Sequence, residues 1–214
     1  MTDAEIRAVI FDCDGTLVDS ETLSIAVLVD FVAEFGYEIK LANALSEWAG
    51  GELPKIFAKV EQELGVTLPT DHLDQFRTRQ MARLAKEVEP IEGAADLLES
   101  LDLPFCVASN APLNKVGLCL ETTGLAGFFP ESHRFSAYTV RKWKPEPDLF
   151  LLAAESLGME PANCAVVEDS IYGVEAGLNA GMHVFAYDPR GELKLPSGVT
   201  VLTTLRELQG HLPG

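Results

Sequence analysis

The sequence predicts an α/β fold in which a parallel sheet is flanked by crossover helices and a helical domain is inserted after the first strand. Short, fully apolar runs recur along the chain, and each of the first three passes directly into polar residues. Helical patterns separate the later runs. A long segment after the first run shows helical periodicity and almost no buried-strand pattern. Because parallel strands need long crossover connections, usually helices, this order of elements indicates a parallel sheet.

The first expected strand covers residues 8–11, which read Ala-Val-Ile-Phe and stop at Asp12. Three similar runs follow, at residues 105–108, 164–167 and 183–186. Such continuous apolar runs are typical of strands buried on both faces. Helical periodicity fills the connections, at residues 113–122, 148–157 and 171–180. Ligands of open α/β sheets bind outside the carboxyl ends of the strands, so the polar residues that end the first three runs should meet there.

The segment from about residue 20 to residue 87 shows helical periodicity and almost no buried-strand pattern. Its apolar positions are Phe31, Phe35, Ile56, Val60, Leu64, Leu73 and Phe76. We expect a core domain of residues 1–17 and 90–214, and a helical domain of residues 18–89 that folds over the strand ends as a cap. An alternative, in which these helices simply flank the sheet, stays open at this point.

Composition narrows the classes of function. Sixteen Lys and Arg stand against 33 Asp and Glu, a formal net charge of −17, which opposes binding to nucleic acid or to an anionic membrane. The acidic start of the chain lacks a targeting pattern, and no apolar run approaches membrane-spanning length, so we expect a cytoplasmic protein. The cysteines form no CxxC pair and are expected to be core residues: Cys13, Cys106, Cys119 and Cys164.

Asp12 and Asp14 follow the first expected strand. On an extended strand end they would share one face, about 6–7 Å apart. One carboxylate could then attack a substrate while the other moves a proton. A calcium-binding EF-hand loop also begins D-x-D, but it requires Gly and Glu where this chain has Leu17 and Leu23. A solvated turn is the other interpretation of this motif taken alone.

Two further groups suit an anion. Ser109 ends the second run with a hydroxyl donor, and the backbone N–H groups around Asn110 could face an anion at the same sheet edge. Lys144 precedes Pro145 and Pro147, which keep the backbone extended and limit where the lysine points. Taken singly, Ser-Asn is usually a turn or a cap, and a lone lysine is usually a solvated charge.

Glu168 and Asp169 end the third run and precede Ser170. A capped helix with acids near its positive end would explain them structurally. Functionally, they suit a hard cation, because magnesium prefers a few carboxylates and several waters. The location and order that these groups share with the preceding motifs favour one common site.

These motifs together resemble those of the haloacid dehalogenase superfamily. The matching segments occur in the family's order, at residues 11–20, 109–110, 144–148 and 168–170. The likeness covers essentially the whole chain. It implies a Rossmann-like parallel-sheet core of the haloacid dehalogenase type with an inserted helical cap of the first type.

The resemblance also implies a reaction. Asp12 would attack phosphorus and form an aspartyl phosphate, and Asp14 would protonate the leaving oxygen and later activate water. The Mg²⁺ cofactor would be held by Asp12, the backbone carbonyl of Asp14 and Asp169, with Glu168 in the outer shell.

In the same scheme, Ser109, Asn110 and Lys144 would bind the phosphoryl oxygens. This agrees with the positioning and electrostatic stabilisation that phosphoryl transfer requires.

We therefore expect a Mg²⁺-dependent phosphatase of a small phosphorylated metabolite, a sugar or polyol phosphate, with 6-phosphogluconate among the candidates. A mutase of the β-phosphoglucomutase type shares the core apparatus, but related mutases carry His at the position of Ser24 and cations in the loop matching residues 48–53. Here that loop has Glu52 and no cation before Lys55. A true dehalogenase is disfavoured, since those relatives lack a carboxylate at the position of Asp14. A non-catalytic binding or regulatory module is the remaining alternative, and the oligomeric state does not follow from the sequence.

Overall fold

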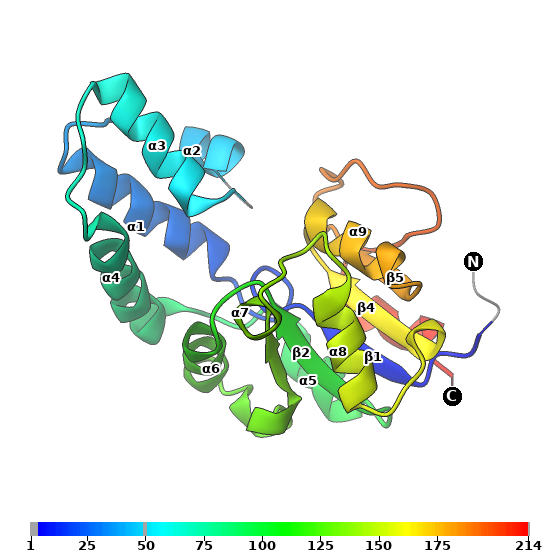
Figure 1. The fold of residues 1–214 in the computed structure, drawn as a ribbon. Helices are drawn as coiled ribbons and strands as arrows, with labels where there is room; N and C mark the ends of the chain where they lie inside the picture. Colours follow the sequence, from blue (N-terminus) through cyan, green and yellow to red (C-terminus); the bar gives the residue numbers. More distant parts are fainter. Residues whose placement is uncertain (1–3, 49–50, 214) are drawn as a thin grey trace. The chain divides into compact units, whose positions relative to one another are not determined.

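The computed structural model describes residues 4–48 and 51–213. The chain divides into two compact units, one formed by Met1–Val18 with Glu89–Gly214 and the other by Asp19–Val88. Figure 1 draws the elements of both units. In the parts of the chain that are described, no helix is both long and apolar enough to cross a lipid bilayer.

A parallel sheet forms the centre of the first unit. Its strands are β1 (Ala8–Phe11), β2 (Phe105–Ser109), β3 (Arg134–Ser136), β4 (Cys164–Glu168), β5 (His183–Tyr187) and β6 (Thr200–Leu202). They lie in the order β3-β2-β1-β4-β5-β6, and every neighbouring pair is parallel. The sequence order reverses at β1, so the carboxyl ends of β1, β2 and β4 are adjacent. This confirms the predicted α/β fold.

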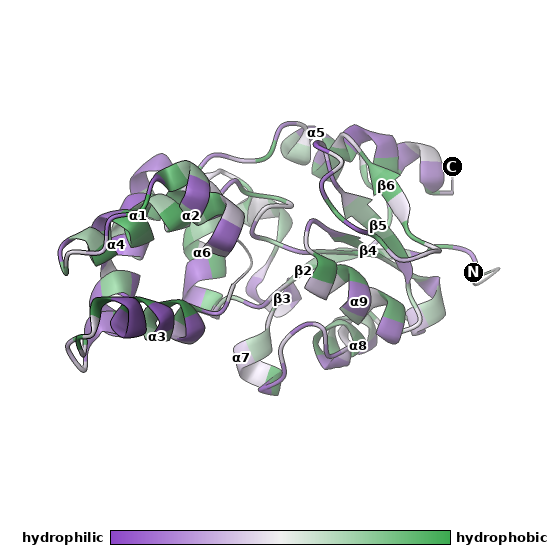
Figure 2. Ribbon diagram, turned by 90° about the horizontal axis from the view of Figure 1, so that it is seen from above, coloured by the Kyte–Doolittle hydropathy of each residue, from purple (hydrophilic) through white to green (hydrophobic). Residues whose placement is uncertain are grey.

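Helices cover both faces of this sheet. The α-helices of this unit are α5 (Ala94–Ser100), α6 (Leu113–Thr122), α7 (Ala137–Val140), α8 (Asp148–Ser156) and α9 (Ile171–Asn179). Short 3-10 helices complete it: η1 (Ala126–Phe128), η2 (Glu131–His133), η3 (Pro161–Asn163) and η4 (Leu205–His211). Figure 2 shows α8 and α9 on one side of the sheet and α5 on the other. The helices expected at 113–122, 148–157 and 171–180 correspond to α6, α8 and α9.

Side-chain packing fixes α9 against the sheet. A Cβ atom on Gly177 would lie 2.8 Å from Val184 Cγ2 and 3.4 Å from Val166 Cβ, so only glycine allows this close approach. The cysteines are buried and free, which confirms that they are core residues. The sheet and α9 therefore form a close-packed support for the loops at the strand ends.

The second unit is helical. It contains α1 (Glu21–Ala33), α2 (Leu41–Trp48), α3 (Leu53–Leu64) and α4 (His72–Glu87). Phe31 lies in its core, with edge-to-face contacts to Phe35, Phe57 and Phe76 at centroid distances of 5.3, 6.0 and 6.1 Å. Such pairs join α1 to α3 and α4, so this segment has a hydrophobic core of its own.

Candidate active site

Three adjacent strand ends bring the predicted site residues together. Asp12 follows β1, Ser109 ends β2, and Glu168 ends β4 and is followed by Asp169. Since β1 pairs with β2 on one side and with β4 on the other, these residues lie at the point where the strand order reverses. This is the position at which open α/β sheets bind ligands.

The side chain of Lys144 contacts residues at all three strand ends. Its side chain is 2% exposed, and its ammonium contacts Asp12 Oδ1. The same ammonium lies 2.7 Å from Glu168 Oε1 and 2.9 Å from the carbonyl oxygen of Ala108. The ring of Phe150 lies beneath it, 4.8 Å from Nζ to the centroid. A buried ammonium is tolerated only when it is paired in this way.

The loop after β2 holds Lys144 by its backbone as well. The Asn110 side chain accepts a hydrogen bond from the Lys144 N–H through Oδ1 at 3.0 Å. Ser136 donates from Oγ to the carbonyl oxygen of Ala111 at 2.6 Å, and the Ala111 N–H donates to Ser109 Oγ at 3.0 Å. The side chain of Asn110 thus orients the lysine, a contact that the sequence did not indicate. A role for Asn110 in binding phosphate stays a prediction.

Asp14 has different partners from Asp12. Lys115 Nζ lies 2.7 Å from Asp14 Oδ1, and Ser109 Oγ donates to Asp14 Oδ2 over a long 3.5 Å. Lys115 lies in the first turn of α6, and its side chain is 14% exposed. The structure therefore adds a second lysine, partly buried, to the site.

The chain bends at Cys13, between Asp12 and Asp14, and a turn follows at residues 15–17. β1 ends at Phe11, and the N–H groups of Leu17 and Val18 both donate to the carbonyl oxygen of Cys13 at 3.0 Å. The extended geometry that we expected at this strand end is therefore wrong. Asp12 and Asp14, which lie on either side of the bend, contact different lysines.

Glu168 is held at the start of α9. Its Oε2 accepts hydrogen bonds from the N–H and the hydroxyl of Ser170, both at 2.9 Å. Ser170 in turn caps α9 by accepting from the Gly173 N–H at 3.1 Å. A Cβ atom on Gly173 would lie 1.8 Å from Glu168 Cδ, so the absence of a side chain there makes room for the carboxylate.

Asp169 lies against the turn that follows β1. Thr16 donates from Oγ1 to Asp169 Oδ1 at 3.2 Å. Gly15 has a φ of +86°, and a Cβ atom on it would lie 1.9 Å from Asp169 Oδ2. Glycine at this position permits both the left-handed backbone and the close approach of the carboxylate.

Burial and charge perturb the groups of the site. Burial, together with the charges of Glu168 and Asp14, raises the pKa of Asp12 to about 7, although Lys144 acts in the opposite direction. Burial disfavours the charged form of Lys144, but Asp12 and Glu168 outweigh it and hold its pKa above the usual value. Burial also opposes the charge of Lys115, which Asp14 restores, so its pKa is raised as well.

These residues fit a hard divalent cation. The expected donors are the carboxylates of Asp12 and Asp169 and the backbone carbonyl of Asp14, and oxygen donors of this kind are those that magnesium prefers. Carboxylates outnumber lysines at the site, and a cation would favour the ionised form of Asp12. Within residues 4–48 and 51–213, no three His, Cys, Asp or Glu side chains are grouped to hold a metal ion. The expected set needs only two carboxylate side chains and one carbonyl, with waters completing it.

Residues 6–181 match the family model of haloacid dehalogenase-like hydrolases, which is most of the chain. The chain belongs to this family. The prediction from the ordered motifs is therefore confirmed.

Relatives and solved structures agree with this assignment. The chain is 37% identical over 208 residues to 6-phosphogluconate phosphatase of Escherichia coli K12, covering 96% of this chain and 94% of that protein. It matches a crystal structure of a haloacid dehalogenase family hydrolase from Deinococcus radiodurans with bound phosphate and sodium, with a TM-score of 0.80, 33% identity and coverage of 98% and 96%. A putative β-phosphoglucomutase from Thermotoga maritima has the same fold, with a TM-score of 0.77 at 22% identity and coverage of 96% and 98%. The predicted enzyme class, a phosphoric monoester hydrolase, agrees with the name of the first of these.

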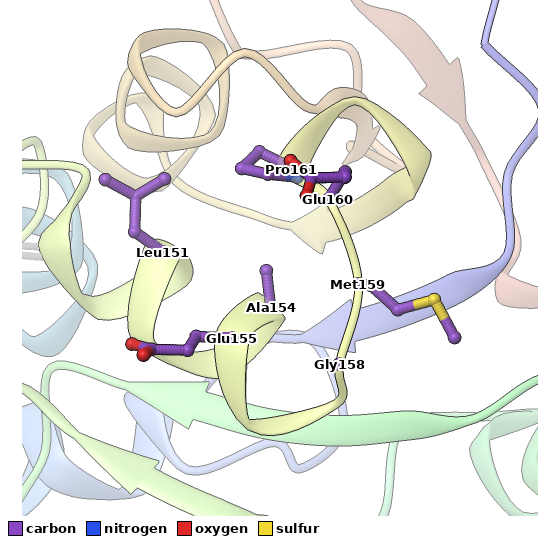
Figure 3. Close-up of a pocket in the computed structure, with 7 residues that line it drawn as sticks. All are labelled: Leu151, Ala154, Glu155, Gly158, Met159, Glu160 and Pro161. Carbon is purple, nitrogen blue, oxygen red and sulfur yellow. The ribbon is translucent and has the colours of Figure 1, made fainter.

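A cavity of about 360 Å³ lies elsewhere on the core unit of this hydrolase. It is lined by Leu151, Ala154, Glu155, Gly158, Met159, Glu160 and Pro161 (Figure 3). The close-up shows the side chains coming from α8 and from the segment that follows it. The lining includes none of the predicted site residues, and its two glutamates do not suit a phosphate.

Proposed function

We propose that this hydrolase is a Mg²⁺-dependent phosphatase that acts through an aspartyl-phosphate intermediate on Asp12. The observation that carries the proposal is the buried contact of Lys144 with both Asp12 and Glu168. It places a fixed positive charge beside a carboxylate at a ligand-binding sheet edge. Phosphoryl transfer depends mainly on this kind of positioning and charge compensation.

In the first step, a carboxylate oxygen of Asp12 attacks phosphorus, and the bond from phosphorus to the leaving oxygen breaks. Lys144 orients Asp12 and offsets charge on the phosphoryl oxygens, while the Ser109 hydroxyl and the N–H groups near Asn110 bind those oxygens. Mg²⁺, held by Asp12, Asp169 and the Asp14 carbonyl, would neutralise phosphoryl charge when bound.

Asp14 moves the protons. It gives its proton to the leaving oxygen in the first step and takes one from the water that hydrolyses the aspartyl phosphate in the second. Asp14 contacts Lys115 and Ser109, whereas Asp12 contacts Lys144, so different lysines hold the proton carrier and the nucleophile.

We infer that the substrate is a small phosphorylated metabolite, a sugar or polyol phosphate, and that residues 18–89 act as the cap that selects it. The 37% identity to 6-phosphogluconate phosphatase supports 6-phosphogluconate as the first compound to test. In the loop that we compared with the mutases, Glu52 pairs with Lys55 at 2.6 Å, so it opposes an anion less than its charge alone suggested. Ala49 and Gly50 of that loop lie outside the described residues.

The proposal is tested with the Asp12→Asn variant. Phosphate release from a panel of phosphorylated metabolites, including 6-phosphogluconate, is measured with Mg²⁺. We expect a loss of about a thousandfold or more in kcat, because an amide is a poor nucleophile. Asp96→Asn is the matched control, since its carboxylate is 67% exposed and pairs with Arg206 away from the site. Activity of Asp12→Asn within tenfold of wild type would exclude the covalent mechanism.

The mutase alternative is decided by the product. We incubate the enzyme with β-glucose 1-phosphate and a bisphosphate primer and measure glucose 6-phosphate and free phosphate. Ser24, which stands where related mutases carry histidine, lies in α1 and donates from Oγ to the carbonyl oxygen of Ser20 at 2.7 Å. We expect free phosphate to be the main product. Accumulation of glucose 6-phosphate faster than free phosphate would refute the phosphatase proposal.

A further inference from the structure

Lys115 forms a partly buried ion pair with the proposed proton carrier. Its Nζ lies 2.7 Å from Asp14 Oδ1, and the two side chains are 14% and 25% exposed. The lysine lies in the first turn of α6, where its N–H donates to the Pro112 carbonyl oxygen at 2.9 Å and to Asn114 Oδ1 at 3.0 Å. A regular helix therefore fixes the backbone from which this ammonium reaches Asp14.

Lys144 is not available for the same task. A lysine ammonium has three N–H donors. Those of Lys144 are directed to Asp12, Glu168 and the carbonyl oxygen of Ala108. Its contacts already match its donors, so the positive charge next to Asp14 comes from Lys115.

The position of the Asp14 carboxylate matters for its chemistry. A general acid must come within about 2.6–3.2 Å of the atom that it protonates. Asp14 lies on the turn after β1, and one of its oxygens is bound by Lys115 while the hydroxyl of Ser109 approaches the other at a long 3.5 Å. Of these two contacts, the short one to Lys115 restrains the direction of the Asp14 carboxylate more strongly.

We propose that Lys115 is a positioning residue that holds Asp14 where it delivers its proton to the leaving oxygen. This inference rests on the proposed phosphatase function. In the step concerned, Asp12 forms the new bond to phosphorus, the bond from phosphorus to the leaving oxygen breaks, and the electron pair of that bond takes the proton of Asp14. Without Lys115, Asp12 can still attack phosphorus, but the leaving oxygen receives its proton late or from solvent.

A shift of Asp14 has an effect that depends on the leaving group. Phenoxide is a poor leaving group and needs a proton as the bond to phosphorus breaks. p-Nitrophenoxide is stabilised by its electron-withdrawing nitro group and leaves without a proton. The ratio of kcat/KM for phenyl phosphate to that for p-nitrophenyl phosphate therefore reports proton delivery, because kcat/KM covers the steps up to release of the alcohol.

The test compares wild type, Lys115→Met and Lys115→Arg with these two substrates in the presence of Mg²⁺. In Lys115→Met, we expect kcat/KM for phenyl phosphate to fall at least tenfold more than that for p-nitrophenyl phosphate. Arginine keeps the charge and should recover most of the ratio. Both substrates are measured on one preparation, so a fraction of unfolded enzyme lowers the two rates equally and leaves the ratio unchanged.

Two further variants calibrate the ratio. Asp14→Asn cannot donate the proton and should give the same selective loss as Lys115→Met. Lys59→Met removes an ion pair with Glu47 on the helical unit and should leave the ratio at the wild-type value. Equal losses on both substrates in Lys115→Met, or no loss, would overturn the role of Lys115. Wild type that hydrolyses neither these esters nor the metabolite panel would instead overturn the proposed function.

Discussion

Gly173 offers a sharp test of how the site is built, because it makes room for a buried carboxylate. We expect Gly173→Ala to displace Glu168. The new Cβ atom would lie 1.8 Å from both Cδ and Oε1 of Glu168 and 2.4 Å from Oε2, whereas ordinary contacts begin at 3.4 Å. The carboxylate would therefore have to move by roughly 1.5 Å.

A displacement of this size breaks the hydrogen bonds that hold Glu168. They join it to Lys144 at 2.7 Å and to Ser170 at 2.9 Å. Disrupting a buried ion pair lowers the free energy of unfolding by about 3–5 kcal/mol. Replacing glycine by alanine in a helix raises it by at most about 1 kcal/mol. We expect the free energy of unfolding to fall by about 2–4 kcal/mol.

Urea unfolding of purified protein measures this change through the transition midpoint and the slope. Gly127→Ala is the control, because a Cβ atom there meets nothing within 4 Å, and we expect it to change stability by less than about 0.5 kcal/mol. Phosphate release by Gly173→Ala should also fall at least tenfold, since Lys144 loses a partner. A variant as stable and as active as Gly127→Ala would refute the packing that we describe.

Three other predictions concern the metal, the Asn110 contact and the Asp12 carboxyl. EDTA should abolish phosphate release and added Mg²⁺ should restore it, whereas full activity in EDTA would remove the metal from the proposal. Asn110→Ala leaves the Lys144 N–H without its acceptor and should raise KM roughly tenfold, and an unchanged KM would show that the contact is dispensable. Burial raises the pKa of Asp12 from 3.8 to about 7, so its contribution to the free energy of unfolding declines as pH rises over that range. In EDTA, Asp12→Asn should therefore gain stability relative to wild type as pH rises, and a difference that is constant with pH contradicts this.

The long apolar runs made the centre of the sheet predictable. β1, β4 and β5 are buried strands that the sequence shows as continuous apolar residues, and β2 has the same pattern. The edge strands β3 and β6 were missed, because each has three residues and is partly exposed. So short a segment carries too few residues for a periodic pattern.

The site was predictable where its residues directly follow buried strands. Lys115 was missed because it lies on a helix that the sequence shows only as an apolar stripe, and a single lysine there is ordinarily a surface charge. The bend at Cys13, which separates Asp12 from Asp14, was missed because extended alternation continues a strand by default. Both depend on contacts between distant segments, for example Lys115 with Asp14, which are 101 positions apart.

The arrangement of β1 between β2 and β4 has a consequence for synthesis of the protein. Asp12 emerges from the ribosome early, but its partner Lys144 lies 132 residues later in the chain. Asp169, the partner of Thr16, lies 153 residues after Thr16. Until β4 has been made, β1 has one open edge and an apolar surface that a chaperone or another nascent chain can bind. Contacts this distant also slow folding, since a long loop must close before they form. We therefore expect the enzyme to acquire its activity after translation of nearly the whole chain, and fragments that end before residue 168 to aggregate.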